Sequence, residues 1–135
     1  MTTEASGGHP FGLRPGQLVQ ELGWDSDVDE DLRTSVMDAI DADMVEDSDE
    51  AVDAVLVWWR AEDGDVTDAL VDALTDLSAD GVIWLLTPKV GRCGHIPQVD
   101  IAEGAATAGL VLTSTLNVSK DWAADKMVRS RGQRR

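Results

Sequence analysis

The sequence predicts an α/β fold in which helices cover both faces of a mostly parallel sheet of about five strands. Two apolar runs, 51–59 and 81–87, are too uniformly apolar for strands with one wet face, so both are expected at the buried centre of the sheet. A helical apolar pattern separates them and makes a strand–helix–strand unit. The last two apolar runs, 110–116 and 122–128, are joined by residues 117–121 alone. Because a parallel crossover needs a longer connection, we expect these two strands to form an antiparallel hairpin.

The first strand and the first helix follow from residues 17–22, which are a short apolar run, and from an apolar stripe within 28–40. Asp25 or Ser26 is expected to cap this helix. The acidic spacing also imitates the start of a calcium loop, but the sixth position is Glu30 where that loop needs glycine. Capping of the helix is therefore the preferred interpretation.

The second helix is expected behind Asp65, a residue placed to cap it. Its stripe of apolar residues recurs with the helical period and consists of Val66, Ala69, Leu70, Ala73, Leu74 and Leu77. A further short helix over 99–108 is expected to end at Gly109, because glycine favours the left-handed conformation that follows many helices. Helices and strands therefore alternate along the chain up to the final hairpin.

Length and composition indicate one packed domain, since the chain has 135 residues, of which 43% are hydrophobic and 27% charged. We expect this domain at residues 11–129, with disordered tails at 1–10 and 130–135. No apolar run approaches the roughly 18 residues of a membrane span, and the first ten residues lack the pattern of a secretory signal. The single cysteine, Cys93, fits a reducing compartment. The expectation is a cytoplasmic protein with no membrane partner.

The charge is strongly negative, with 26 acidic against 11 basic side chains and a net charge of −15. Residues 21–80 hold 21 of the acids and only Arg33 and Arg60 as cations, whereas 126–135 holds five cations and no acid. Such a surface repels phosphate backbones, so we expect no nucleic-acid partner. The acidic segment is interpreted as solvated surface, and a docking face for a basic protein is the alternative.

The order β-α-β-α-β-α-β-β gives a three-layer Rossmann-like arrangement that resembles the C-terminal half of a class I methyltransferase domain. The sequence also resembles the actinobacterial domain-of-unknown-function family 3052 over about residues 11–129. The resemblance rests on a start like Leu13-Arg14-Pro15-Gly16-Gln17, a centre like 52–59, a block like 68–89 and an end like Asp121-Trp122. Membership of this family implies no established activity.

A cofactor site of the methyltransferase kind is not expected. Such a site needs glycines after the first strand, but here that loop continues as Gly23-Trp24-Asp25, with a bulky indole where the cofactor would lie. One helix and the acidic stretch 41–50 link the first strand to Ala51, so the usual second and third strands are missing. We predict no cofactor.

The candidate binding site is the loop 87–95, which follows a buried strand at the edge where open parallel sheets bind ligands. Lys89 and Arg92 lie on this loop, and with Arg60 they would bring three cations to one crevice, which suits a carboxylate or phosphate. The alternative is that Lys89 caps a helix or pairs with an acidic neighbour. His95 belongs to the same site, but with Cys93 it lacks the third group of a catalytic set.

Aromatic residues gather near the same strand ends. Trp24, Trp59 and Trp122 all lie at strand ends or in loops, where they could form a wall beside Lys89, although core packing is the default for tryptophan. The nitrogen and sulfur ligands available to zinc are Cys93 and two histidines, so no metal site and no catalytic residues are predicted.

These observations predict a non-catalytic binding or regulatory accessory protein. Its partner would be a protein or a small anionic metabolite held at the carboxyl edge of the sheet, near Lys89. One alternative is a minimal methyltransferase-like transferase that uses the Lys89 crevice. The other is an acidic interaction module that docks a basic protein, including one that normally binds DNA.

Overall fold

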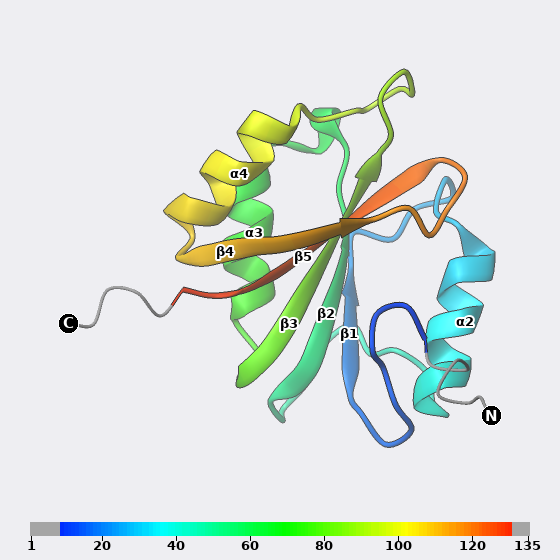
Figure 1. Cartoon of the computed structure of the whole chain (residues 1–135). Coiled ribbons are helices and arrows are strands. Elements are labelled where there is room, and N and C mark those ends of the chain that lie inside the picture. The colour runs from blue at the N-terminus through cyan, green and yellow to red at the C-terminus, as the bar shows by residue number, and fades with distance from the viewer. Residues whose placement is uncertain (1–8, 131–135) are drawn as a thin grey trace.

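The computed structural model describes residues 9–130 and confirms the predicted α/β architecture. In chain order its elements are β1 (Val19–Leu22), α2 (Glu30–Ile40), β2 (Val52–Trp58), the short 3-10 helix η1 (Ala61–Asp63), α3 (Val66–Leu74), β3 (Leu77–Pro88), α4 (Gln98–Thr107), β4 (Leu110–Leu116) and β5 (Trp122–Arg129). The sheet forms the middle of three layers, with α2 on one face and α3 and α4 on the other (Figure 1).

The five strands lie in the order β1-β2-β3-β5-β4. β1 pairs in parallel with β2, and β2 with β3, while β5 runs antiparallel to both β3 and β4. The final hairpin is therefore confirmed, and its second strand inserts beside β3 rather than at the outside. Gly109 opens it with the predicted left-handed conformation, at φ +84°.

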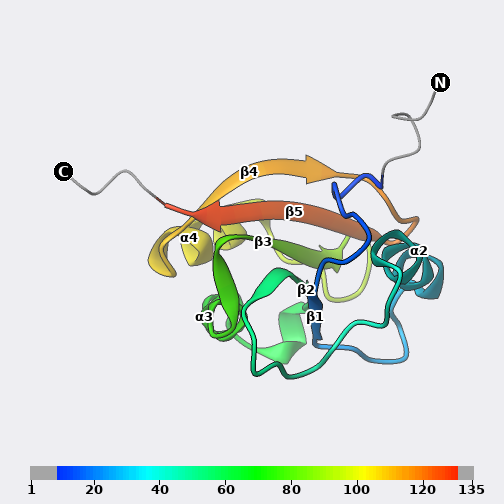
Figure 2. The ribbon, with the colours of Figure 1, turned by 90° about the horizontal axis from the view of Figure 1, so that it is seen from below.

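Two apolar cores flank the sheet, one under α3 and α4 and the other under α2. The view from below shows α2 apart from α3 and α4 (Figure 2). The core under α3 and α4 includes side chains at most 1% exposed, namely Val55, Val57, Leu70, Ile83, Leu85, Ile101 and Met127. The core under α2 includes Val19, Val36, Ile40, Leu56, Trp58, Leu86 and Ala124, which are equally buried. Central strands covered on both sides explain why β2 and β3 have no regular polar alternation.

The junction between α3 and β3 differs from the prediction. α3 ends at Leu74, which is only partly buried, and Leu77 belongs to β3, where it pairs with Val52. Residues 78–81 of β3 lie opposite Asp53 alone, because the next pair in the register is Ala54 with Val82, so β3 bulges at this point. Gly81 permits this bulge, since a Cβ there would lie 2.3 Å from a Leu77 side-chain carbon. The helical spacing of Leu77 was thus coincidental.

The cap of α2 also differs from the prediction. Asp29, not Asp25 or Ser26, caps the helix, with its Oδ1 accepting from the backbone N–H of Leu32 at 3.0 Å. Each of these residues is a good capping type, and periodicity alone does not choose among neighbours. The link from α2 to β2 adds an isolated parallel bridge between Val45 and Gln20 on the outer edge of β1.

The expected terminal tails lie mostly outside the described residues, which exclude 1–8 and 131–135. Of the described part, His9 is packed rather than free, because its Nε2 lies 2.9 Å from the hydroxyl oxygen of Ser35 on α2. Its ring also meets Phe11 edge to face, and Phe11 stacks on Trp84 at 4.1 Å.

Candidate functional site

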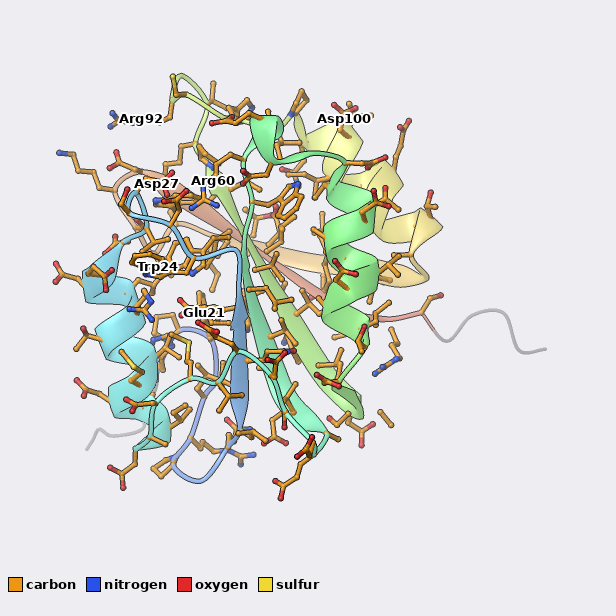
Figure 3. The ribbon with its side chains drawn as sticks, turned by 180° about the vertical axis from the view of Figure 1, so that it is seen from behind. Glu21, Trp24, Asp27, Arg60, Arg92 and Asp100 are labelled. Atoms are coloured by element: carbon orange, nitrogen blue, oxygen red, sulfur yellow. The ribbon has the colours of Figure 1, made fainter. Side chains whose placement is uncertain are left out.

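The carboxyl ends of β1, β2 and β3 lie at one edge of the sheet, and Arg60 occupies its centre (Figure 3). Its guanidinium binds both carboxylate oxygens of Asp27, from Nη2 at 2.5 Å and from Nε at 3.0 Å. Nη1 donates to the carbonyl of Gly23 at 2.8 Å and to the Asp63 carboxylate at 3.1 Å. All three guanidinium nitrogens are engaged, so Arg60 ties the loop after β1 to the loop after β2.

The cluster around Arg60 extends to the hairpin. The guanidinium carbon lies 5.2 Å from the centre of the Trp122 ring, and the indole N–H of Trp122 donates to the carbonyl of Asp27 at 3.2 Å. Hydrogen bonds from Arg60 lower the pKa of Asp27. Burial of the carboxyl group opposes this shift, and the positive charge of Arg60 adds to it. The geometry is that of a structural clamp, because Arg60 is 5% exposed and surrounded by its own partners.

A second ionic cluster fastens α2 to the sheet. Glu21 on β1 is 8% exposed, and its two oxygens accept from Nε and Nη2 of Arg33 at 2.6 and 2.7 Å. The indole N–H of Trp58 donates to the same carboxylate at 2.9 Å. These bonds raise the pKa of Arg33 further above its usual value. The sequence carried a signal for this pair, namely a glutamate inside an apolar strand and an isolated arginine on the facing helix.

The crevice between β1 and β2 is closed by backbone. Gly23 follows β1 with φ +78°, and a Cβ built on it would lie 2.1 Å from the carbonyl oxygen of Trp58. Only glycine fits such an approach without displacement of the chain. The loop after β1 is thus pressed against the end of β2 and is held there by Arg60.

An open pocket of about 340 Å³ lies instead at the end of β3, beside the start of α4. Its lining consists of Thr87, Pro88, Lys89, Val90, His95, Ile96, Gln98, Asn117 and Ala123. The pocket therefore receives residues from β3, from the loop 89–96, from the first turn of α4 and from both sides of the hairpin. It coincides with the loop that the sequence singled out.

Lys89 is the cation of this pocket. Its backbone N–H donates to the carbonyl of Asp121 at 2.9 Å, but within residues 9–130 its ammonium has no ion-pair partner. The first turn of α4 adds positive character, because the backbone N–H groups of Gln98 and Val99 are likewise unpaired in the described chain. His95 directs Nδ1 to the carbonyl of Pro88 at 3.0 Å, so that nitrogen carries a proton.

The sheet beneath the pocket contains a buried carboxylate that the sequence analysis missed. Asp125 on β5 is 1% exposed, and its Oδ1 accepts from the Thr115 hydroxyl at 2.5 Å and from the Gln98 amide at 3.4 Å. Its Oδ2 is buried and has no hydrogen-bond partner among the described residues. An aspartate in the middle of the final strand, on the same face as Ala123 and Met127, was the available signal.

The structure does not gather all the residues expected at this site. Lys89 and His95 line the pocket, whereas Arg92 forms an exposed ion pair with Asp121 at 2.9 Å on the projecting loop (Figure 3). Arg60 is enclosed in its clamp, so the expected group of three available cations is not formed. Of the three cations, Lys89 alone lines the pocket.

The three tryptophans do not form a common wall either. The indole of Trp24 is 53% exposed and donates to Glu30 at 3.3 Å, whereas Trp59 donates to the carbonyl of Gly64 at 3.1 Å. Trp122 is buried under Arg60. None of the three lines the pocket at the end of β3.

Residues 9–130 contain no group of three or more His, Cys, Asp or Glu side chains arranged to hold a metal ion. None of their helices has the length and apolar character needed to cross a membrane.

Comparison with known sequences places the chain in a family. A family model described as a protein of unknown function, DUF3052, matches residues 8–131. The chain belongs to this family. Uncharacterized proteins from Mycobacterium tuberculosis and Mycobacterium bovis are 46% identical to it over 124 residues, which cover 91% of this chain and 78% of theirs.

Solved structures similar to this DUF3052 member are methyltransferases. A putative methyltransferase from Thermoplasma acidophilum matches with a TM-score of 0.56 at 14% identity, over 90% of this chain and 72% of that one. An O-methyltransferase from neocarzinostatin biosynthesis, solved with S-adenosylmethionine, matches with a TM-score of 0.64 at 13% identity, over 84% and 49%. At these identities the likeness establishes a shared fold, namely that of class I methyltransferases.

Proposed function

We propose that the protein is a non-catalytic binding module that holds a small anionic ligand in the pocket at the end of β3. The observation that carries the proposal is Lys89, a lysine without an ion-pair partner in residues 9–130, in a pocket at the carboxyl edge of an open sheet. In a protein of net charge −15, an uncompensated cation beside a concave surface is a local attraction for anions.

The pocket fits a small metabolite. Its volume of about 340 Å³ lies at the lower end of the range of ligand sites, about 300 to 1,000 Å³. The free N–H groups at the start of α4 and the Lys89 ammonium both favour a carboxylate or phosphate group. Burying the anion there would neutralise Lys89 without breaking an existing ion pair.

The residues present do not fit S-adenosylmethionine. In this chain the contact between Gly23 and the Trp58 carbonyl closes the place after β1, and Arg60 fills the adjoining edge with its own hydrogen bonds. β1 and β2 are direct neighbours, with one helix and a single bridge in the segment that joins them. These contacts support a binding role over transfer of a methyl group.

The test is calorimetric titration with sodium phosphate and sodium succinate at constant ionic strength. We expect saturable binding to the wild-type chain. The same ligand should also raise the melting temperature, because a ligand that binds the native state stabilises it by mass action. Lys89→Met should abolish that binding while the fold melts as before, since methionine keeps most of the apolar stem.

The matched control is Lys126→Met, because Lys126 lies on β5 and alternation places it on the opposite face of the sheet from Asp125. This variant removes the same charge but should bind as the wild type does. Equal binding by the wild type and Lys89→Met would refute the role of Lys89. A large fall in melting temperature of Lys89→Met with unchanged binding would assign Lys89 to the fold instead.

A further inference from the structure

A buried oxygen of Asp125 that lacks a hydrogen-bond partner among residues 9–130 indicates which chemical groups the ligand carries. This inference rests on the proposed function of the pocket. Asp125 Oδ2 is fully buried without a donor among the described residues, although carboxylate oxygens inside proteins are nearly always hydrogen-bonded. Its other oxygen is held by Thr115 and Gln98, so the carboxylate is fixed in place and cannot rotate toward solvent. A fixed acceptor of this kind requires a donor.

Strand register places Asp125 directly under the pocket. Thr87 is opposite Ala123, and both line the pocket, while Leu85 is opposite Asp125 in the row two residues further along the same face. Gln98 joins the two levels, because it lines the pocket and its amide donates to Asp125 at the long distance of 3.4 Å. Gln98 therefore links the buried carboxylate to the pocket through a long hydrogen bond.

We propose that the ligand is a zwitterion, with an anionic group at Lys89 and an ammonium group that donates to Asp125. The two protein groups have opposite charge, with Lys89 in the lining of the pocket and Asp125 beneath it, linked to the pocket by Gln98. A cation acceptor and an anion acceptor at such a separation form the pattern that recognises an amino acid. A ligand without a hydrogen-bond donor at that end would leave the buried oxygen of Asp125 unsatisfied, and an ammonium group is the donor that also compensates a carboxylate charge.

The register also bounds the length of the ligand. Lys89 lies four residues after Leu85, the residue opposite Asp125, which corresponds to about 13 Å of extended strand. The lysine and aspartate side chains cover part of this separation from its two ends. The remainder is spanned better by a chain of several carbon atoms than by glycine, so the ammonium and the acid should be several bonds apart.

The experiment compares two series of small molecules on the full chain by ligand-observed NMR titration. One series is glycine, 3-aminopropanoate, 4-aminobutanoate, 5-aminopentanoate and 6-aminohexanoate. The other consists of the straight-chain carboxylates of the same carbon number, which lack the amine. We expect the amino acids to bind more tightly than their matched carboxylates, by about tenfold or more at the best chain length, with glycine weaker than the longer members.

Variants separate the two ends of the site. Asp125→Asn should lose the advantage of the amino acids but keep the weaker binding of the carboxylates, because Lys89 is untouched. It should melt no lower than the wild type, since it replaces an unsatisfied charge with a neutral group. Asp100→Asn on the exposed first turn of α4 removes the same charge outside the pocket and should retain the amino-acid preference.

The outcomes distinguish this inference from the function on which it rests. Equal, Lys89-dependent binding of both series would overturn the zwitterion and leave the anion site standing. An amino-acid advantage that survives in Asp125→Asn would overturn the role of Asp125. Absence of Lys89-dependent binding for both series and for phosphate would overturn the proposed function itself. The comparison of the two series on the wild-type chain needs no variant, so it decides even if Asp125→Asn fails to fold.

Discussion

Replacing Arg60 by alanine tests whether the centre of the carboxyl edge is a clamp or a ligand site. The change removes the donor to the carbonyls of Gly23 and Trp58, which lie 2.8 and 3.3 Å from Nη1. It also removes the ion pairs to Asp27 and Asp63, whose side chains are 52% and 32% exposed.

The magnitude follows from these partners. The carbonyl of Trp58 is buried, and leaving it without this donor costs about 1 to 3 kcal/mol. The carbonyl of Gly23 belongs to an exposed residue, so water replaces much of the lost bond. The ion pairs add less, about 0 to 1 kcal/mol each, because water solvates the two carboxylates. Loss of the arginine stem from the Trp122 ring adds a further contribution. We therefore expect Arg60→Ala to lower the free energy of unfolding by about 2 to 5 kcal/mol.

Urea denaturation followed by circular dichroism measures this loss directly. The control is Arg92→Ala, which removes an arginine whose ion pair with Asp121 has both partners about half exposed. That variant should stay within about 0.5 kcal/mol of the wild type. If the free energy of unfolding of Arg60→Ala also stayed within about 0.5 kcal/mol of the wild type, Arg60 would not stabilise the fold. Arg60 would then again be a candidate residue for binding an anion.

Three other expectations follow from the same structure. Leu70→Ala should lower the free energy of unfolding by about 2 to 5 kcal/mol because Leu70 is 0% exposed, whereas Asp72→Ala on the exposed face of α3 should have little effect in the same denaturation assay. Bonds to Arg60 lower the pKa of Asp27 in the folded protein from its ordinary value of 3.8, so the Asp27–Arg60 pair stabilises the fold fully above pH 3.8 and less as the pH falls through the lower pKa of the folded state. In Asp27→Asn, the free energy of unfolding should therefore fall less steeply as the solution is acidified. Calorimetry should detect no binding of S-adenosylmethionine, and a micromolar dissociation constant would contradict the closure described at Gly23.

The sequence was sufficient for the architecture because its strongest signals are periodic and local. The apolar runs 54–58 of β2 and 83–86 of β3 are buried on both faces, and the short link after β4 forces an antiparallel return. The errors occur where a local pattern is ambiguous. Leu77 matches the helical spacing, yet it belongs to β3 because pairing with Val52 and the bulge at Gly81 are tertiary facts.

The site was predicted in part, for a related reason. Position after a buried strand was enough to find Lys89 and His95, because the carboxyl edge of a parallel sheet is set by topology. The environment of Arg60 was not predictable, since its partner Asp27 lies 33 residues away and any of several acids was available. Asp125 was missed because its isolation depends on packing between α4 and the hairpin.

Closure at Gly23 and the opening at β3 are two results of the same arrangement. The chain goes from β1 to β2 through one helix, so their ends are adjacent, and Arg60 can bridge the loop after β1 to the loop after β2. The hairpin then inserts β5 beside β3, and Trp122 packs under the clamp. On the other face, this insertion aligns Ala123 and Asp125 beneath the first turn of α4, where a lysine without an ion pair in residues 9–130 follows β3. The same arrangement thus closes the end of β1 and leaves a pocket open at the end of β3, which is where we propose that the ligand binds.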